Sequence, residues 1–436
     1  MKKKSKKKVG VFFLVILSIG LIFSAYQFLL RPILKKVMAT EVISIIIAFI
    51  ILAALVITLL ITLTLILYLI ILKAQEVKNT RRWKHYRRKS ISVLIIILII
   101  LSGFTYYSQK NVYTKPLCNE YNDIIPTSVA SLEKVKLNDN EEWISVRGKD
   151  KSKPILLVLS DGPGKSQMSS FNKSLETLED DFVVVNWDEL GTGKSYKSVD
   201  ELTVDTYVSD GIELTKYLCK KYNKDKIYIL GNSFGSTLGI SMIKNNPDLY
   251  AGFIGVSSII SVKRNEEYRY NKALEIAEKK DEEDILRKLK AQGKPPYDKN
   301  EYKKQKVYHD YLKAKENENN KIEGEGENSF RNIFSSEYGL LDKVRIVTKE
   351  KETYDKIFKS YYDMDLINEV KEVKVPVYFF QGSYDDLASP DILNEYFSIL
   401  NASDKQIIWF EKSGSMPWLS ENDEFVKNIN KKFLNN

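Results

Sequence analysis

Residues 231–235 (GNSFG) place a serine between two glycines, a pattern that can present a nucleophilic hydroxyl group. The apolar run KIYIL directly precedes this pattern and predicts a strand over residues 226–230, and the residues after it predict a helix over 236–246. A sharp turn from a strand into a helix needs residues without bulk at both glycine positions. The spacing therefore predicts that Ser233 is held clear of a sheet as the nucleophile of an acyl-transfer reaction.

Four further stretches accompany this motif in a fixed order along the chain. They are residues 160–164 (SDGPG), 187–195 (WDELGTGKS), 375–385 (VPVYFFQGSYD) and 407–417 (IIWFEKSGSMP). Together with the serine motif they resemble the α/β-hydrolase superfamily and, within it, the proline iminopeptidase-like serine peptidases. The resemblance covers nearly all of residues 125–436. It implies hydrolysis of a small peptide, amide or ester by a serine nucleophile, with no cofactor and no metal.

The resemblance implies a role for several individual positions. Ser233 matches the nucleophile, and Asp385 matches the acid of a Ser-His-Asp triad, with the neighbouring Asp386 as the alternative. In this family the catalytic histidine follows the acid by about thirty residues. The matching position here is Ser415, in residues 413–415 (SGS), where the family has S-G-H. The triad therefore lacks its histidine.

No other residue is an obvious replacement for this base. The whole sequence contains two histidines, His85 and His309. His85 falls in a basic segment that we expect in the cytoplasm, and His309 falls in an insertion that would have to fold over Ser233. Lys165 and Lys412 flank the altered motifs and could act as in Ser–Lys enzymes, although solvated side chains are the simpler interpretation. Because a serine hydroxyl is a weak nucleophile without a base, we expect activity to be weak or absent.

The oxyanion hole also departs from the family pattern. The resemblance implies that the backbone N–H of Phe234 and one N–H from the SDGPG turn, at Gly162 or at Asp161, would stabilise the oxyanion. Ser160 stands where the family has a histidine, and the Asp161 carboxylate would oppose the negative charge of an intermediate. Leu190 stands where the family has an arginine. The resemblance assigns no substrate-binding residue.

Residues 111–436 are enough for one large α/β domain. Short β-rich runs alternate with amphipathic stretches, which favours a mostly parallel sheet with helices on both faces. We expect strands over residues 143–146, 155–160, 182–187, 226–230, 252–257, 375–381 and 406–411. Residues 260–365 interrupt this alternation and predict a helical cap over the strand ends. The expected architecture is therefore the α/β-hydrolase fold with a helical cap.

Three long uncharged runs precede this domain, at residues 9–30, 42–72 and 90–109. Each is long enough to cross a hydrocarbon core of about 30 Å. We therefore expect residues 1–110 to form a membrane anchor of three transmembrane helices. The runs contain no Asp, Glu, Lys, Arg or His, which favours a plain anchor over a transport or signalling pathway.

The charges that flank these runs predict the orientation of the chain. Residues 1–8 contain six lysines, and residues 73–89 contain eight lysines or arginines with one glutamate. Because basic flanks stay in the cytoplasm, we expect a multi-pass cell-membrane protein with a cytoplasmic N-terminus and an extracytoplasmic hydrolase-like domain. The chain carries +9 in total, yet its acids outnumber its bases after the anchor. The lipid bilayer is therefore an expected partner, and nucleic acid is not.

Two classes of function remain open from the sequence. One is a membrane-anchored serine hydrolase similar to the proline iminopeptidases. The other is a non-catalytic extracytoplasmic module that binds a peptide or another small ligand on the same fold. In the cap, Glu266 and Glu267 would either bind a substrate amino group or lie on a solvated helix face. Cys118 and Cys219 would be either free or paired, and the sequence indicates no oligomeric state.

Overall fold

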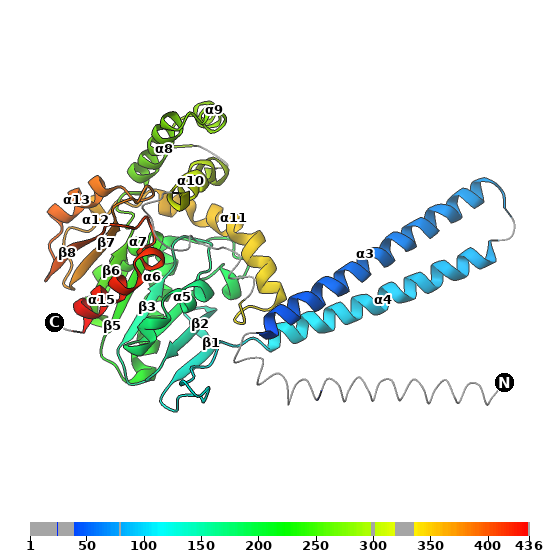
Figure 1. Ribbon diagram of the computed structural model, residues 1–436, viewed down its shortest axis with the longest axis horizontal. Coiled ribbons are helices and arrows are strands. Elements are labelled where there is room, and N and C mark those ends of the chain that lie inside the picture. Colours follow the sequence, from blue (N-terminus) through cyan, green and yellow to red (C-terminus); the bar gives the residue numbers. More distant parts are fainter. Residues whose placement is uncertain (1–23, 25–38, 78–79, 298–300, 319–334, 435–436) are drawn as a thin grey trace. The chain divides into compact units, whose positions relative to one another are not determined.

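The structure is a computed structural model that describes residues 24, 39–77, 80–297, 301–318 and 335–434. The chain divides into two compact units, Met1–Pro116 and Leu117–Asn436, and each is described by itself. Figure 1 labels the helices and strands of both units. Apart from Ser24, the span predicted over residues 9–30 lies outside the described residues.

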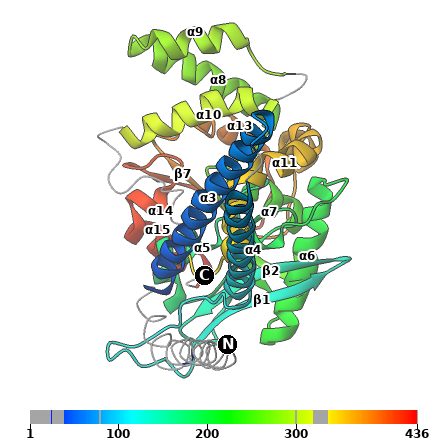
Figure 2. The same cartoon turned by 90° about the vertical axis from the view of Figure 1, so that its right-hand side faces the viewer.

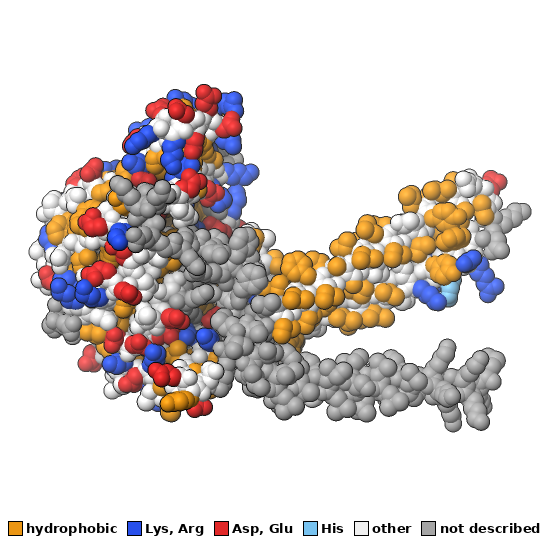
Figure 3. Space-filling view, viewed as in Figure 1, with side chains coloured by type: hydrophobic (Ala, Val, Ile, Leu, Met, Phe, Trp, Pro, Cys, Tyr) orange, Lys and Arg blue, Asp and Glu red, His pale blue; other side chains and the backbone are white. Residues whose placement is uncertain are grey.

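Two long helices make up most of the described part of the first unit, α3 (Ala39–Ala74) and α4 (Arg81–Lys110). They lie side by side (Figure 1 and Figure 2), and Thr62 Oγ1 of α3 lies 2.6 Å from Ser90 Oγ of α4. Most of their apolar side chains face outward and form the continuous hydrophobic surface seen in Figure 3. Such a surface is unusual on a protein in water. Two of the three predicted spans therefore coincide with helices that are long and apolar enough to cross a membrane.

The second unit is built on an eight-stranded sheet with the order β1-β2-β4-β3-β5-β6-β7-β8 (Figure 1). The pairs β1–β2 and β2–β4 are antiparallel, and the other five pairs are parallel. The prediction of a mostly parallel sheet is thus confirmed. The strands are β1 (Val129–Leu137), β2 (Asn140–Gly148), β3 (Ile155–Leu159), β4 (Val183–Asp188), β5 (Ile227–Asn232), β6 (Tyr250–Val256), β7 (Val377–Gly382) and β8 (Lys405–Phe410).

Helices cover both faces of this sheet. Along β3, Leu157 and Leu159 belong to one buried cluster, whereas Leu156 and Val158 belong to another. The first cluster includes side chains of α6, α7 and α13, and the second includes side chains of α5, α14 and α15. Because side chains alternate along a strand, a sheet covered on both faces is apolar at nearly every position. These helices are α5 (Met168–Ser174), α6 (Val204–Tyr222), α7 (Phe234–Asn245), α13 (Pro390–Ile399), α14 (Pro417–Ser420) and α15 (Asn422–Phe433).

The described residues between β6 and β7 contain the helices of the segment that was predicted as a cap. They are α8 (Val262–Lys279), α9 (Glu283–Gln292), α10 (Glu301–Glu318), α11 (Leu340–Tyr362) and α12 (Leu366–Glu369). Helices α8, α9 and α10 lie together at one end of the unit (Figure 1 and Figure 2). They share a small buried cluster of their own, which includes Tyr270, Leu289 and Tyr308. These three helices thus form a separately packed layer beside the sheet.

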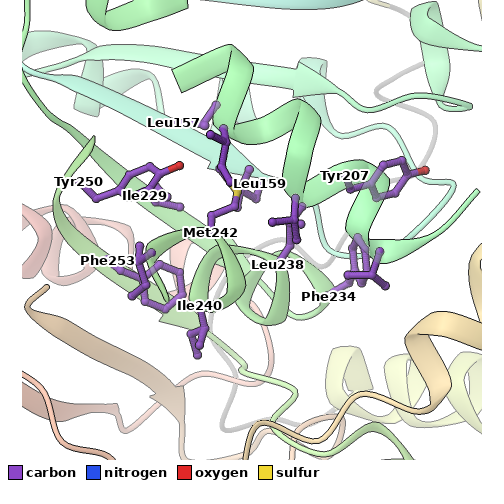
Figure 4. Close-up of a cluster of buried hydrophobic side chains, with 14 of the residues drawn as sticks. Leu157, Leu159, Tyr207, Ile229, Phe234, Leu238, Ile240, Met242, Tyr250 and Phe253 are labelled. Atoms are coloured by element: carbon purple, nitrogen blue, oxygen red, sulfur yellow. The ribbon is translucent and has the colours of Figure 1, made fainter. Parts of the chain in front are cut away.

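Helix α7, which follows the serine motif, packs closely against the sheet (Figure 4). Its side chains Leu238, Ile240 and Met242 are buried, as is Phe253 of β6. At Gly239, a Cβ atom would lie only 2.4 Å from the Phe253 ring. The absence of a side chain at this glycine therefore lets α7 approach β6, and the contact holds the start of α7 in place.

Removing the Phe253 ring should destabilise the second unit. Phe253 is fully buried, so Phe253→Ala removes apolar contacts and leaves a cavity. We expect the free energy of unfolding to fall by about 3–5 kcal/mol, measured by urea titration of the full chain in detergent micelles. Tyr121→Ala is the control, because this side chain is 85% exposed, and it should change the value by less than about 0.5 kcal/mol. An equal loss of free energy of unfolding in the two variants would contradict the packing of Phe253 against α7.

Candidate active site

The serine motif forms the predicted turn between a strand and a helix. Strand β5 ends at Asn232, helix α7 begins at Phe234, and Ser233 between them has φ of 50° and ψ of −108°. A positive φ is strained for a residue with a side chain and persists only where the surroundings enforce it. Here the Ser233 N–H donates to the Val256 carbonyl oxygen (2.9 Å). Ser233 is only partly buried, so the turn leaves its hydroxyl accessible.

Both glycines of the motif are required by close backbone contacts. A Cβ atom on Gly231 would lie 2.3 Å from the Gly235 carbonyl oxygen. A Cβ atom on Gly235 would lie 2.6 Å from the carbonyl oxygens of Leu159 and Ser160. The Gly235 N–H also donates to the Ser160 carbonyl oxygen (2.9 Å). The turn therefore places the end of β3 directly beside the serine.

The region predicted as the oxyanion hole contains a negatively charged side chain. The Phe234 N–H points toward the Asp161 carbonyl oxygen at 3.4 Å, and Gly162 lines the same cavity as Ser233. Asp161 Oδ2 lies 3.4 Å from Lys165 Nζ and 4.0 Å from Lys313 Nζ. Asp161 Oδ1 is buried and has no hydrogen-bond partner among the described residues. A carboxylate thus lines the same cavity as Ser233, Phe234 and Gly162.

The predicted acid, Asp385, lies in the loop after β7 and is almost fully buried. Its Oδ1 accepts hydrogen bonds from the N–H groups of Leu387 (2.8 Å) and Ala388 (2.9 Å). Its Oδ2 accepts a hydrogen bond from Gln381 Nε2 (2.8 Å). Burial raises the pKa of Asp385, and these hydrogen bonds act in the opposite direction. The local hydrogen bonds therefore hold the carboxyl group of Asp385 in one orientation.

Ser415, which was predicted to stand at the position of the triad histidine, contacts a carboxyl group from the cap. Its Oγ donates to Glu316 Oε2 (2.7 Å), and its N–H points to the same oxygen (3.3 Å). The Asp386 N–H donates to Glu316 Oε1 (2.9 Å). Burial, and then the negative charge of Asp385, raise the pKa of Glu316 to about 8. Sequence analysis did not identify Glu316, and nothing in its local sequence distinguishes it from neighbouring glutamates.

A cavity of about 500 Å³ opens beside Ser233. Its walls come from the SDGPG turn, the start of α7, and the cap helices α8, α10 and α11. Ser415 and Trp418 contribute from the chain after β8. Four acidic and four basic side chains line the cavity together with His309 and apolar groups. A mixed lining of this size suits a small ligand that has both apolar and polar parts.

Comparison with known proteins agrees with this geometry. Residues 157–334 match the family model described as serine aminopeptidase, S33. The probable aminopeptidase YbaC of Bacillus subtilis (strain 168) is 26% identical over 312 residues, which cover 70% of this chain and 96% of that protein. The proline iminopeptidase of Heyndrickxia coagulans is 26% identical over 285 residues, which cover 64% of this chain and 90% of that protein. The chain has the α/β-hydrolase fold.

A solved structure shows the same fold as this α/β-hydrolase. The crystal structure of VinJ has a TM-score of 0.50 and 16% sequence identity, and the match covers 70% of this chain and 98% of VinJ. The α/β-hydrolase fold that the motifs predicted is therefore confirmed. The individual catalytic roles of Ser233, Asp385 and Ser415 remain predictions.

A second group of charged residues faces the cavity of the α/β-hydrolase from the cap. Arg269 Nη1 lies 2.5 Å from Glu266 Oε1, and the Tyr308 hydroxyl donates to Glu266 Oε2 (2.6 Å). His309 Nε2 lies 2.9 Å from Arg269 Nη1. Burial and the charge of Arg269 lower the pKa of His309, so a neutral ring accepts this hydrogen bond. The expectation of a solvated helix face is wrong for Glu266, which is buried, whereas the side chain of Glu267 is partly exposed.

The three other candidate bases lie in different surroundings. Lys165 lines the cavity, but its Nζ faces Asp161. Lys412 is exposed and is not part of the cavity wall. His85 belongs to helix α4 of the first unit. Lys165 and Lys412 are therefore poor replacements for a base held against Ser233.

The loop after β4 holds the SDGPG turn through two buried acids. Asp188 accepts hydrogen bonds from Ser166 Oγ (2.5 Å) and from the Tyr338 hydroxyl (3.1 Å). Glu189 accepts one from Ser160 Oγ (2.9 Å). Burial raises the pKa of Asp188 to about 6 and that of Glu189 to about 8. Ser160 is therefore a structural contact in this α/β-hydrolase, because its hydroxyl is bonded to Glu189.

The raised pKa of Glu189 predicts that its contribution to the free energy of unfolding falls as the pH rises. Its pKa of about 8 in the folded protein lies above the ordinary glutamate value of 4.5, so the unfolded chain loses this proton at a lower pH. The contribution of Glu189 to the free energy of unfolding should be largest below about pH 4.5 and should decrease up to about pH 8. We expect Glu189→Gln to reduce this decrease, measured by urea titrations of the full chain across this range. Glu213→Gln, at an exposed helical glutamate, is the control, and an identical slope in both variants would contradict the assignment.

Proposed function

We propose that this α/β-hydrolase is a membrane-anchored protein that binds a small peptide, amide or ester beside Ser233, and that its serine hydrolase activity is weak or absent. One observation carries the proposal. Ser415 occupies the position of the triad histidine, and its hydroxyl is hydrogen-bonded to Glu316. The other class of function is a fully non-catalytic extracytoplasmic binding module, and the activity test below separates the two.

The chemistry of the site supports weak activity. A serine hydroxyl becomes an effective nucleophile only when a base takes its proton, and Ser415 cannot accept that proton near neutral pH. Removing the histidine from the triad of subtilisin lowers kcat by roughly a million-fold. The Asp161 carboxylate would further oppose the negative charge of a tetrahedral intermediate. Both effects act on the reaction and not on the binding of a ligand.

The cavity supports ligand binding. Its volume of about 500 Å³ lies within the ordinary range for small-molecule sites, and Ser233 lies in its wall. The relatives are named as a probable aminopeptidase and a proline iminopeptidase, which makes a short peptide or an amide the first ligand to test. We propose no cofactor, no metal and no nucleic acid as a partner.

Membrane anchoring rests on the first unit. Helices α3 and α4 are apolar along most of their length, and their outward-facing side chains would be favourable in lipid. We propose a third span over residues 9–30, which gives three spans in total. The basic residues 1–8 and 73–89 would lie in the cytoplasm, and the hydrolase-like unit would lie outside the cell membrane.

The first test measures labelling and turnover by the full chain in detergent micelles. With a fluorophosphonate probe, prolyl arylamides and p-nitrophenyl esters, we expect a low signal that falls to background in Ser233→Ala, whereas the same signal from both proteins would favour the fully non-catalytic module. Rapid labelling and turnover that Ser233→Ala abolishes would contradict weak activity. Binding is measured separately as the change in tryptophan fluorescence on addition of a prolyl amide, because Trp418 lines the cavity. We expect this change in Ser233→Ala as well, and its loss in Trp418→Phe identifies the reporting residue.

The second test concerns the anchor and its orientation. The full chain should stay in the membrane pellet after alkaline carbonate extraction, because its apolar helices are embedded in lipid. Protease added to intact cells should remove the hydrolase-like unit, detected by an epitope tag at the C-terminus. Permeabilised cells are the control for accessibility. A unit that is protected until the cells are permeabilised would contradict the proposed orientation.

A further inference from the structure

One face of helix α10 lies over the cavity and ends in Glu316. Gln305, His309 and Lys313 follow one another at intervals of four residues and all line the cavity. Glu316 follows three residues later, so it continues the same face of the helix. Its side chain reaches past the cavity into the loops after β7 and β8, where it is 6% exposed. The C-terminal end of α10 is thus joined to the loops after β7 and β8 through the carboxyl group of Glu316.

The contacts of Glu316 are specific and involve both loops. Oε2 faces the hydroxyl and the N–H of Ser415, and Oε1 accepts the Asp386 N–H. Glu316 therefore faces three donors from two loops that are separate in the sequence. Glu318, two residues later on the same helix, is exposed and pairs with Lys315 at 2.8 Å. Glu316 is therefore buried because it contacts these two loops, and not because this end of α10 is buried as a whole.

This carboxyl group takes up space that an imidazole would need. A histidine at position 415 would extend its ring from the same Cβ atom, and the present Ser415 hydroxyl already contacts Glu316 at 2.7 Å. A ring directed toward Asp385 would then meet the Glu316 carboxyl group, because that group lies between Ser415 and the loop after β7 that contains Asp385 and Asp386. We propose that Glu316 is a positioning residue that stands in the place of the triad histidine and latches α10 over the ligand cavity. The proposal rests on the proposed ligand-binding role of that cavity.

The surroundings of Glu316 make the latch sensitive to pH. The groups that face it or its two loops are Asp385 and Asp386 after β7, Ser415 after β8, and Tyr268 and Lys272 of α8. Lys272 Nζ lies 3.8 Å from Asp386 Oδ1. Two acids thus lie on the loop to which Glu316 binds, and the nearest cation among these groups is directed at Asp386.

The direction of the pH effect follows from this arrangement. Glu316 has a pKa of about 8 when docked, because of burial and then the charge of Asp385, and an ordinary value of 4.5 when free. Burial raises the pKa of Asp385 as well. Ionisation therefore opposes docking increasingly from about pH 4.5 to about pH 8, and docking is strongest below this range. The latch should hold α10 in mildly acidic solution and release it in alkaline solution.

Hydrogen exchange of α10 tests the latch without any measurement of activity. For the full chain in detergent micelles, we expect the protection of residues 301–318, corrected for intrinsic exchange, to fall several-fold from about pH 6 to about pH 8.5. Glu316→Gln keeps the shape of the side chain but cannot ionise, so the protection of residues 301–318 in this variant should not vary with pH. Glu318→Gln is the matched control and should behave as the unmodified protein. If Glu316→Gln keeps the pH dependence, or if its protection is lost equally at every pH, the latch is refuted.

Rebuilding the triad tests the assignment of Glu316 to the place of the histidine. Ser415→His alone should raise ester hydrolysis little, because Glu316 blocks the ring. Ser415→His combined with Glu316→Ala should raise it at least tenfold above the single variant, and Ser233→Ala should abolish the gain. Thermal melts verify that each variant is folded. A single variant as active as the double, or a folded double with no gain, would overturn the assignment.

The two tests separate this inference from the proposed function. High activity of the unmodified protein would refute weak catalysis and would leave the exchange measurement as the test of the latch. Loss of prolyl amide binding at a pH where α10 stays protected would refute the link between the latch and the ligand cavity. The link would be supported if prolyl amide binding and the protection of α10 both weaken as the pH rises. In Glu316→Gln this weakening should be smaller.

Discussion

The close approach of two backbones determines the geometry of the site. Gly235, in the first turn of α7, lies against the carbonyl groups of Leu159 and Ser160 at the end of β3. Because the helix is held this close, Ser233 keeps its positive φ in spite of the strain. The same contact brings the SDGPG turn to the side of the serine. Contacts of α7 with the sheet, such as that between Gly239 and Phe253, maintain this approach.

Several residues that depart from the expected family pattern are hydrogen-bonded or buried within this fold. The hydroxyl of Ser160 bonds to Glu189, and the hydroxyl of Ser415 bonds to Glu316. Leu190, in place of an arginine, is buried in the main apolar cluster. Buried polar groups are costly unless they are hydrogen-bonded, so these pairs stabilise the altered loops.

Local sequence patterns were sufficient to predict the parallel sheet and the serine turn. Each of these elements depends on neighbouring residues, as the apolar run of β5 and its two glycines show. Strand β1 (Val129–Leu137) was not predicted, because at the edge of the sheet it mixes polar and apolar residues without a clear apolar run. Glu316 could not be predicted either. Its partners lie 70 and 99 residues away, and only the packing of α10 distinguishes it from the exposed Glu318.

The Asp161 carboxylate would disfavour a negatively charged transition state more than a neutral bound ligand. Catalysis requires interactions that are stronger in the transition state than in the ground state. A neutral carbonyl group gains negative charge on its oxygen as a tetrahedral intermediate forms, and the Asp161 carboxylate opposes this change. Lys165 Nζ and Lys313 Nζ lie 3.4 Å and 4.0 Å from Asp161 Oδ2 and offset part of this charge. A tetrahedral intermediate in this cavity would therefore have to form against the charge of Asp161, whereas a neutral ligand would bind without that cost.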